Sequence, residues 1–241
     1  FKEALCMNTI VRYEDRGEFG NNKYRGNFSG RLLDDLHSVY NFDEITDYMR
    51  GSNTSGEWAE ARKVRSTTYD LNMGFDLMKE EIREINKNII WHPPYWDIIK
   101  YSGFMYSKGK PVANDLSHIA DYKEFMRAIN YCLAKQYASL KTGGRMFILM
   151  ADVKKNRQLY SMLLDMDKLG TIEQIVIKEQ INCMSDSKSY AGKLIRIAHE
   201  YLLILRKDNP YLYNMKIVKD LSIDIRDSLK ITWKDLVAAV L

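Results

Sequence analysis

The stretch Asn88–Asp97, with the sequence Asn-Ile-Ile-Trp-His-Pro-Pro-Tyr-Trp-Asp, constrains the fold of this chain most. Its apolar residues 89–91 predict a short buried strand, which the two prolines end because proline cannot donate a hydrogen bond to a neighbouring strand. Proline also holds the preceding residue extended, so the turn is stiff. Open α/β sheets bind ligands at such turns, beyond the carboxyl ends of buried strands. Tyr95 and Trp96 would then form an aromatic platform at the sheet edge, unless both rings pack into the core.

Length and composition indicate a globular protein with one large α/β domain or two small ones. The 241 residues suffice to bury a core, and no apolar run approaches the roughly 18–20 residues of a membrane span. Cys6, Cys132 and Cys183 lack the spacing of a zinc site or a disulfide framework, which indicates a reduced, cytoplasmic protein. The net charge of +4 permits nucleic-acid binding without arguing for it. Because the chain opens on Phe1 without a signal peptide, we expect a trimmed or excised segment.

Hydrophobic periodicity predicts helices that alternate with strands. Expected helices cover residues 31–40, 57–64, 77–86, 121–140 and 155–169. Expected strands cover residues 44–49, 66–71, 89–92, 145–151 and 171–178, with a last one inside 195–206. This alternation predicts one α/β domain with a mostly parallel sheet, and we place it at residues 1–207. Residues 208–241 are expected to be a C-terminal extension, cut off before its end.

A second turn with ligand chemistry follows the first expected strand. It runs through Arg50-Gly51-Ser52-Asn53-Thr54-Ser55-Gly56 to a helix N-terminus, where backbone N–H groups point outward and glycine lets a ligand approach. Asn53 tolerates the left-handed backbone that such a turn requires. Asp70 closes the next strand, where a carboxylate can accept from ribose hydroxyls. An Asx turn or a helix cap is the alternative role for Asp70, because Asn72 follows closely.

These turns, in this order, resemble motifs of the amino-methyltransferases. Those enzymes transfer a methyl group from S-adenosylmethionine to an exocyclic amine, mostly adenine N6 or cytosine N4 in DNA. His92-Pro93-Pro94-Tyr95 resembles motif IV, (Asp/Asn/Ser)-Pro-Pro-(Tyr/Phe), and departs from it at His92. Residues 47–54 resemble motif I, Asp-Pro-x-x-Gly-Ser-Gly-Thr, and depart from it at Tyr48 and Asn53.

The resemblance covers roughly residues 12–207 with its motifs in unpermuted order. The loop 12–30 resembles motif X, which lies against the methionine part of the cofactor, although Ser29 is also a candidate N-cap for the next helix. The loop 179–193 resembles the motif VIII region around the target base. The His199-Glu200 pair after it is interpreted as structural. The resemblance implies a Rossmann-like class I methyltransferase fold and a bacterial or phage DNA methyltransferase, of the kind found in restriction–modification systems.

The resemblance also implies a mechanism. The target base is flipped out of the duplex, because its amine is out of reach inside it. Tyr95 stacks on the base, and the Pro93 carbonyl and the His92 side chain accept hydrogen bonds from its amine. Methyl transfer is then an in-line displacement, with adenine N6 as the preferred target and no metal.

We predict three groups of site residues. The catalytic residues are His92, Pro93, Pro94 and Tyr95. The residues that bind S-adenosylmethionine are Asn27, Ser29, Asp47, Met49, Gly51, Ser52, Thr54, Asp70, Asp76 and His92. The residues that bind DNA belong to loops in which basic side chains alternate with aromatic rings. They are Trp96, Lys100, Tyr101, Lys108, Lys110, Lys188 and Lys193. A solvated charged surface is the alternative interpretation of these loops.

Three other functions stay open. Cytosine N4 methylation uses nearly the same motif IV. Protein glutamine methylation, as in the release-factor methyltransferases, uses Asn-Pro-Pro-Tyr. A catalytically impaired nucleic-acid-binding subunit is compatible with the departures at Asn53 and His92. The sequence also leaves open whether sequence choice resides in the loops, beyond Leu241, in a second copy of the chain or in a separate specificity partner.

Overall fold

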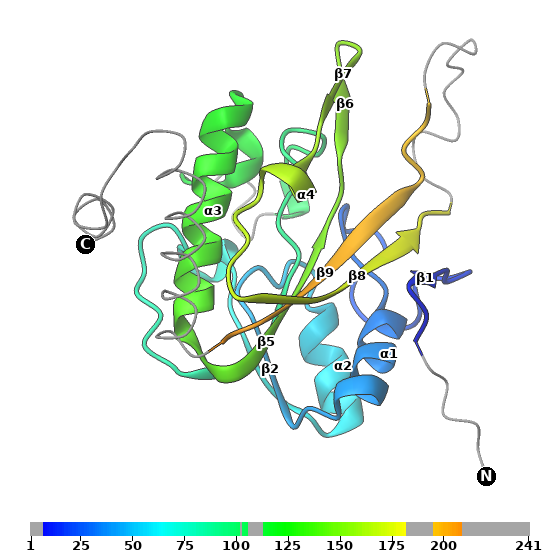
Figure 1. Ribbon diagram of the computed structural model, residues 1–241, viewed down its shortest axis with the longest axis vertical. Helices are drawn as coiled ribbons and strands as arrows, with labels where there is room; N and C mark the ends of the chain where they lie inside the picture. Colours follow the sequence, from blue (N-terminus) through cyan, green and yellow to red (C-terminus); the bar gives the residue numbers. More distant parts are fainter. Residues whose placement is uncertain (1–6, 102, 106–112, 182–194, 209–241) are drawn as a thin grey trace, which may run out of the picture.

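A mostly parallel sheet of seven strands organises the molecule (Figure 1), whose computed structural model describes residues 7–101, 103–105, 113–181 and 195–208. Its strands lie in the order β1-β8-β9-β5-β4-β2-β3, and only β9 runs antiparallel to its neighbours. The strands are β1 Ile10–Val11, β2 Glu44–Asp47, β3 Arg65–Thr68, β4 Asn86–Trp91, β5 Leu140–Met150, β8 Thr171–Glu179 and β9 His199–Arg206. A separate hairpin consists of β6 Val153–Lys155 and β7 Gln158–Tyr160.

Helices cover both faces of the sheet (Figure 1). The α-helices are α1 Gly30–Tyr40, α2 Thr54–Arg62, α3 Tyr122–Ser139 and the single turn α4 Met162–Asp165. Short 3-10 helices are η1 Leu71–Met73, η2 Gly103–Met105 and η3 Leu116–His118. This arrangement confirms the predicted Rossmann-like α/β fold. No helix within the described residues is long and apolar enough to cross a lipid bilayer.

Successive residues of the central strands point to opposite faces, which divides the core into two clusters. From β4, Ile89 and Trp91 pack with α3, whereas Ile90 packs with α1 and α2. All three side chains are 0% exposed. This explains why the buried strand is apolar throughout and not alternating, since helices cover both of its faces.

Side-chain caps begin two of the predicted helices. Ser29 Oγ accepts from the N–H of Arg31 at the start of α1, which confirms Ser29 as an N-cap. Asp121 Oδ1 accepts from the N–H of Glu124 at the start of α3, over 2.9 Å. Both caps satisfy a backbone donor that the first helical turn cannot satisfy by itself.

The connections reverse direction between β2 and β4. From β2 the chain crosses through α2 to β3 on one side, and from β4 it crosses through α3 to β5 on the other side. The crevice beyond the carboxyl ends of two such strands is the usual ligand site of an open α/β sheet. The two turns singled out in the sequence follow β2 and β4, so both lie at this switch point.

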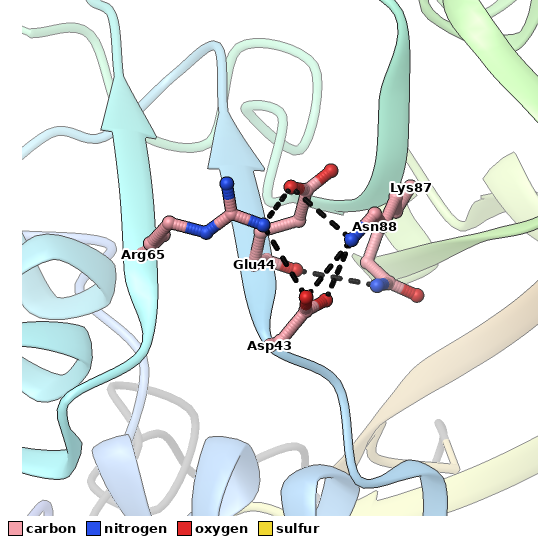
Figure 2. A network of polar contacts seen from close by, with 5 residues as sticks. All are labelled: Asp43, Glu44, Arg65, Lys87 and Asn88. Atoms are coloured by element: carbon pink, nitrogen blue, oxygen red, sulfur yellow. Dashed lines mark hydrogen bonds and ion pairs between the residues drawn. The ribbon is translucent and has the colours of Figure 1, made fainter.

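A polar network joins the strands at their amino ends, opposite the switch point (Figure 2). Arg65 pairs with Glu44 over 2.8 Å, and Lys87 pairs with Asp43 over 2.9 Å. Asn88 donates to the backbone oxygen of Glu44. The network joins the amino ends of β2, β3 and β4, so it is remote from the switch point and has a structural role.

The helix predicted for residues 77–86 is wrong. This segment has no helix because tertiary partners capture its backbone. Asp76 Oδ1 accepts from the N–H of Met78, as in an Asx turn. Lys135 of α3 donates to the carbonyl oxygens of Leu77 and Glu80, over 2.8 and 2.5 Å.

The helix predicted for residues 155–169 is also wrong. The segment contributes to the β6–β7 hairpin, followed by the single turn α4. Asn156 and Arg157 have φ values of 52° and 65°, so the turn has the left-handed residues of a two-residue hairpin. The hairpin extends beyond the carboxyl end of β5, at the top of Figure 1.

Candidate active site

A cavity lies at the switch point, beyond the carboxyl ends of β2, β3 and β4. Its walls come from the N-terminal loop, from the turns after these strands, and from Tyr101 and residues 114–116. The predicted site residues among its lining are Asn27, Met49, Gly51, Ser52, Asp70, His92, Pro94 and Tyr101. Parts of the chain that are distant in sequence, from Asn27 to Tyr101, therefore meet in one place.

The turn after β2 keeps its shape despite Asn53. Gly51 and Asn53 adopt left-handed φ values of 50° and 70°, as the sequence predicted for Asn53. The Asn53 side chain does not line the cavity but turns toward Gly56, where a Cβ would overlap its amide group. The missing side chain of Gly56 thus gives Asn53 room away from the ligand space.

Asp70 connects the ends of β3 and β2. Its Oδ2 accepts from the N–H of Gly51 and its Oδ1 from the N–H of Asn72, each over 2.9 Å. The second contact is the Asx-turn role, and Asp70 is also the N-cap of η1. Each carboxylate oxygen can accept more than one hydrogen bond, so Asp70 keeps acceptor capacity for a ligand in the cavity.

The N-terminal loop closes over the turn after β2. The Thr54 hydroxyl donates to Asn27 Oδ1, and a Cβ at Gly20 would overlap the Thr54 hydroxyl. Tyr24 of this loop lies 5.8 Å, between ring centroids, from Tyr101, and both residues line the cavity. The predicted motif X-like loop is therefore part of the cavity wall.

His92 begins a partly buried chain of hydrogen bonds. Its Nε2 lies 2.8 Å from Tyr95 Oη, and that hydroxyl donates to Glu200 Oε1 over 2.9 Å. Glu200 Oε2 accepts from Lys178 Nζ over 2.7 Å. The chain connects the turn after β4 with β9 and β8.

Burial and neighbouring charges determine the protonation states of the residues in this hydrogen-bond chain. Burial lowers the pKa of His92 to about 4, because the attraction of Glu200 offsets it only in part, so the imidazole is neutral at pH 7. Burial works to raise the pKa of Glu200, but Lys178, with help from the Tyr95 hydroxyl, holds it below its usual value. Burial and Glu200 raise the pKa of Tyr95 well above its usual value. The site thus presents a neutral imidazole beside a carboxylate.

Several predicted site residues do not line the cavity. Ser29 caps α1, and Thr54 and Asp47 are buried, with Asp47 accepting from the N–H of Met49 and from the Ser55 hydroxyl. Asp76 accepts from Asn114, which itself lines the cavity. Pro93 and Tyr95 are likewise absent from the lining.

The DNA contact predicted for Trp96 is wrong. Trp96 is 4% exposed, its indole N–H donates to the backbone oxygen of Ile119, and its ring packs against Tyr122 and Tyr160. A positive φ of 50° turns this side chain into the core instead of toward solvent. Lys100 is exposed. The other four predicted lysines, Lys108, Lys110, Lys188 and Lys193, lie outside the described residues.

Comparison with known families decides the assignment. The N6/N4 methyltransferase family model, described as DNA methylase, matches residues 86–235, more than half of the chain. The chain belongs to this DNA methylase family. The match confirms the resemblance to the amino-methyltransferases, and with it S-adenosylmethionine as the cofactor of this methylase.

Two solved structures illustrate what this chain is similar to. TTHA0409 of Thermus thermophilus, described as a candidate DNA modification methylase, has 22% identity over 56% of this chain and 51% of that chain, with a TM-score of 0.36. TrmN of Thermus thermophilus has 14% identity over 76% of this chain and 50% of that chain, with a TM-score of 0.42. The chain spans about half the length of these two proteins. Among curated proteins, none matches this chain significantly.

The cavity of the methylase fits the polar half of its cofactor. Ser52 Oγ is buried and has no hydrogen-bond partner among the described residues, although it belongs to the lining. A buried hydroxyl without a partner costs roughly 1–3 kcal/mol, which a polar ligand can recover. Met49, Phe75 and Leu77 add apolar side chains to the same lining.

Sequence reasoning missed Glu200, Lys178 and Arg16. Glu200 and Lys178 are paired across β9 and β8 in the sheet register, and Arg16 Nη1 is buried without a partner within the described part of the chain. Burial lowers the pKa of Arg16, and the attraction of Glu200 works against that shift. A carboxylate that leads into the apolar run Leu202–Leu205 was the available signal, and it was interpreted as structural.

Proposed function

We propose that this methylase transfers the methyl group of S-adenosylmethionine to an exocyclic amine of a DNA base, with adenine N6 as the target. One observation carries the proposal: the turn after β2 and, through His92 and Pro94, the turn after β4 line the same cavity at the switch point. A cofactor site and an amine-orienting turn must be adjacent for the transfer, because in-line displacement requires the two reacting groups in close alignment.

Residues of the first turn would hold the cofactor, which supplies an electrophilic methyl group when bound. Gly51 brings the backbone close to the ligand, and Ser52 offers the unpaired hydroxyl. Asp70 would accept from ribose hydroxyls while it holds the N–H of Gly51. The aromatic rings of Tyr24, Phe28 and Tyr101 line the same space for flat rings.

His92 would orient the target amine. In motif IV this position is occupied by a hydrogen-bond acceptor, and a neutral imidazole has one unprotonated nitrogen that can accept. The pKa of about 4 keeps that nitrogen free of a proton at neutral pH. The Pro93 carbonyl is the second acceptor in this proposal. An amine inside a duplex cannot reach the cavity, so the base has to be flipped out.

The β6–β7 hairpin would provide a DNA contact. Its residues 153–160 include Lys154, Lys155 and Arg157 and no acidic residue. Lys155 ties the hairpin to the motif IV turn, since its ammonium pairs with Asp97 over 2.5 Å and lies 4.3 Å from the Trp96 ring centroid. Arg157 is exposed at the tip. A basic tip anchored beside the catalytic turn suits the phosphate contacts that position a protein on DNA.

Mass spectrometry of nucleosides tests the proposal. Duplex DNA is incubated with the protein and S-adenosylmethionine carrying a labelled methyl group, then digested to nucleosides. We expect labelled N6-methyladenine. Labelled N4-methylcytosine would reassign the base, label in a glutamine of an added protein substrate would reassign the substrate, and DNA binding without label would indicate an impaired subunit.

A further inference from the structure

The ion pair between Lys178 and Glu200 ends the chain of hydrogen bonds that begins at His92, and it is unusual because both charges are largely removed from solvent. The Lys178 and Glu200 side chains are 14% and 9% exposed, and both belong to strands of the main sheet. Removing two charges from water costs several kcal/mol per ion, so a buried pair is weak evidence for a contribution to stability. A role in the neighbouring cavity accounts better for its presence.

We propose that Glu200 is a positioning residue for methyl transfer, which acts through Tyr95 to hold His92 in the tautomer protonated at Nε2. His92 Nδ1 is then the bare nitrogen that accepts from the target amine. This inference rests on the proposed function and names a residue of that same site.

The direction of the hydrogen bonds fixes the tautomer. A phenol has one proton, and the Tyr95 hydroxyl donates it to Glu200 Oε1 over 2.9 Å. The same oxygen can therefore only accept in its 2.8 Å contact with His92 Nε2, so Nε2 carries the imidazole proton. In a neutral ring, Nδ1 is then unprotonated. Within the described residues, no hydrogen bond involves Nδ1, and His92 is part of the cavity lining.

Lys178 keeps the hydrogen bonds from His92 through Tyr95 to Glu200 in this donor–acceptor direction. If Glu200 were protonated, it would become a donor to Tyr95, and the phenol would then donate to His92 Nε2 and leave the proton on Nδ1. Lys178 donates to Glu200 Oε2 over 2.7 Å from directly across the β8–β9 pairing, which favours the carboxylate. The pair therefore sets which nitrogen of His92 is left without a proton.

Nitrogen-15 NMR of the whole protein, labelled at histidine, reads the tautomer without substrate. The four histidines of the chain are assigned by single substitution. We expect His92 to show a protonated Nε2 and a bare Nδ1 at pH 7. A protonated Nδ1 would overturn the proposal, whether or not the protein methylates DNA.

Two variants test the path to Glu200. Tyr95→Phe keeps the ring and removes the hydroxyl, so the His92 tautomers should mix and kcat should fall at least about tenfold, with S-adenosylmethionine affinity unchanged. Glu200→Gln keeps an acceptor oxygen for Tyr95 and should retain more activity than Glu200→Leu. If both Tyr95→Phe and Glu200→Leu keep the wild-type tautomer and kcat, Glu200 has no positioning role.

Tyr122→Phe is the matched control. Tyr122 donates to Asp165 over 2.7 Å, so this variant also loses a tyrosine–carboxylate hydrogen bond, but outside the cavity lining. It should leave the His92 spectrum and kcat unchanged. A wild-type protein that transfers no methyl group would reject the proposed function and the positioning role with it, while the tautomer spectrum would still report whether the chain of hydrogen bonds runs as described.

Discussion

The N–H of Gly51 donates to Asp70 Oδ2 over 2.9 Å, across the carboxyl ends of β2 and β3. This bond holds the backbone of the glycine turn and aims the carboxylate at the cavity at the same time. The two interpretations of Asp70 from sequence, a local turn and a ribose acceptor, are therefore compatible. The turn role is observed, and the ribose role remains a prediction.

Asp70→Asn tests the ribose role. The amide has one acceptor oxygen in place of two, so either the backbone or a ribose hydroxyl loses a partner. We expect the affinity for S-adenosylmethionine to fall by about 1–3 kcal/mol, measured by titration calorimetry. Asp165→Asn, which weakens a contact with Tyr122 outside the cavity lining, should bind the cofactor like wild type. Equal affinities for wild type and Asp70→Asn would remove Asp70 from the cofactor site.

Gly56→Ala tests the accommodation of Asn53. Alanine is normally better than glycine inside a helix by about 0.5–1 kcal/mol, but here its Cβ would overlap the Asn53 amide. We expect Gly56→Ala to lower the free energy of unfolding by about 1–3 kcal/mol, the usual range for overpacking. The double variant Asn53→Gly with Gly56→Ala should recover it, because the clash is gone. Urea unfolding of the four proteins measures the coupling, and additive effects would mean that the two side chains do not compete for this space.

Sequence patterns predicted the cavity better than its surroundings. The resemblances to motifs I and IV rest on short turns that follow buried strands. The sheet fixes the position of such turns, so Gly51 and His92 line the same cavity once the strands have the right order. Glu200 was missed because it reaches His92 only through Tyr95. Strand pairing over long sequence separations, such as Lys178 with Glu200, cannot be obtained from local periodicity.

The two wrong helices have a common cause. Residues 77–86 and 155–169 carry apolar residues at helical spacing, but contacts distant in sequence decide their conformation. Lys135 binds the carbonyls of the first segment, and the left-handed Asn156 and Arg157 turn the second into a hairpin. The prediction for Trp96 failed for a similar reason. It required the ring to face solvent as part of an aromatic platform, but with a positive φ the side chain points into the core.

Arg157→Ala tests the hairpin as a DNA contact. If the exposed guanidinium lies on a phosphate, its loss should weaken binding to all DNA sequences alike. It should also make the slope of logarithmic affinity against logarithmic salt concentration shallower by about one unit. Fluorescence anisotropy over a salt series measures both. Arg83→Ala is the control, since its side chain is 88% exposed in the loop before the amino end of β4. Parallel salt slopes for wild type and Arg157→Ala would place the DNA elsewhere.

The pH dependence of the rate tests His92 as an acceptor. The ordinary pKa of histidine is 6.5, but burial lowers that of His92 to about 4. The neutral form is the acceptor, so the rate should stay level on acidification past 6.5 and fall only as the pH approaches about 4. An imidazolium cannot accept a hydrogen bond from the amine, and it would repel the positive charge that develops there. His92→Asn has no titrating group at this position, so it should lack this acid limb and retain some turnover.

Stability must be followed over the same pH range, because the same group affects it. His92 has a lower pKa folded than unfolded, so between 6.5 and about 4 the unfolded chain binds more protons, and the free energy of unfolding falls as the pH falls. Asp47 acts in the opposite sense: burial raises its pKa from 3.8 to about 6, so the folded chain binds more protons in that window. Only the difference in the free energy of unfolding between wild type and His92→Asn therefore isolates the contribution of the imidazole. Rates are taken where circular dichroism shows both proteins folded, and superimposable pH–rate profiles there would reject the acceptor role of His92.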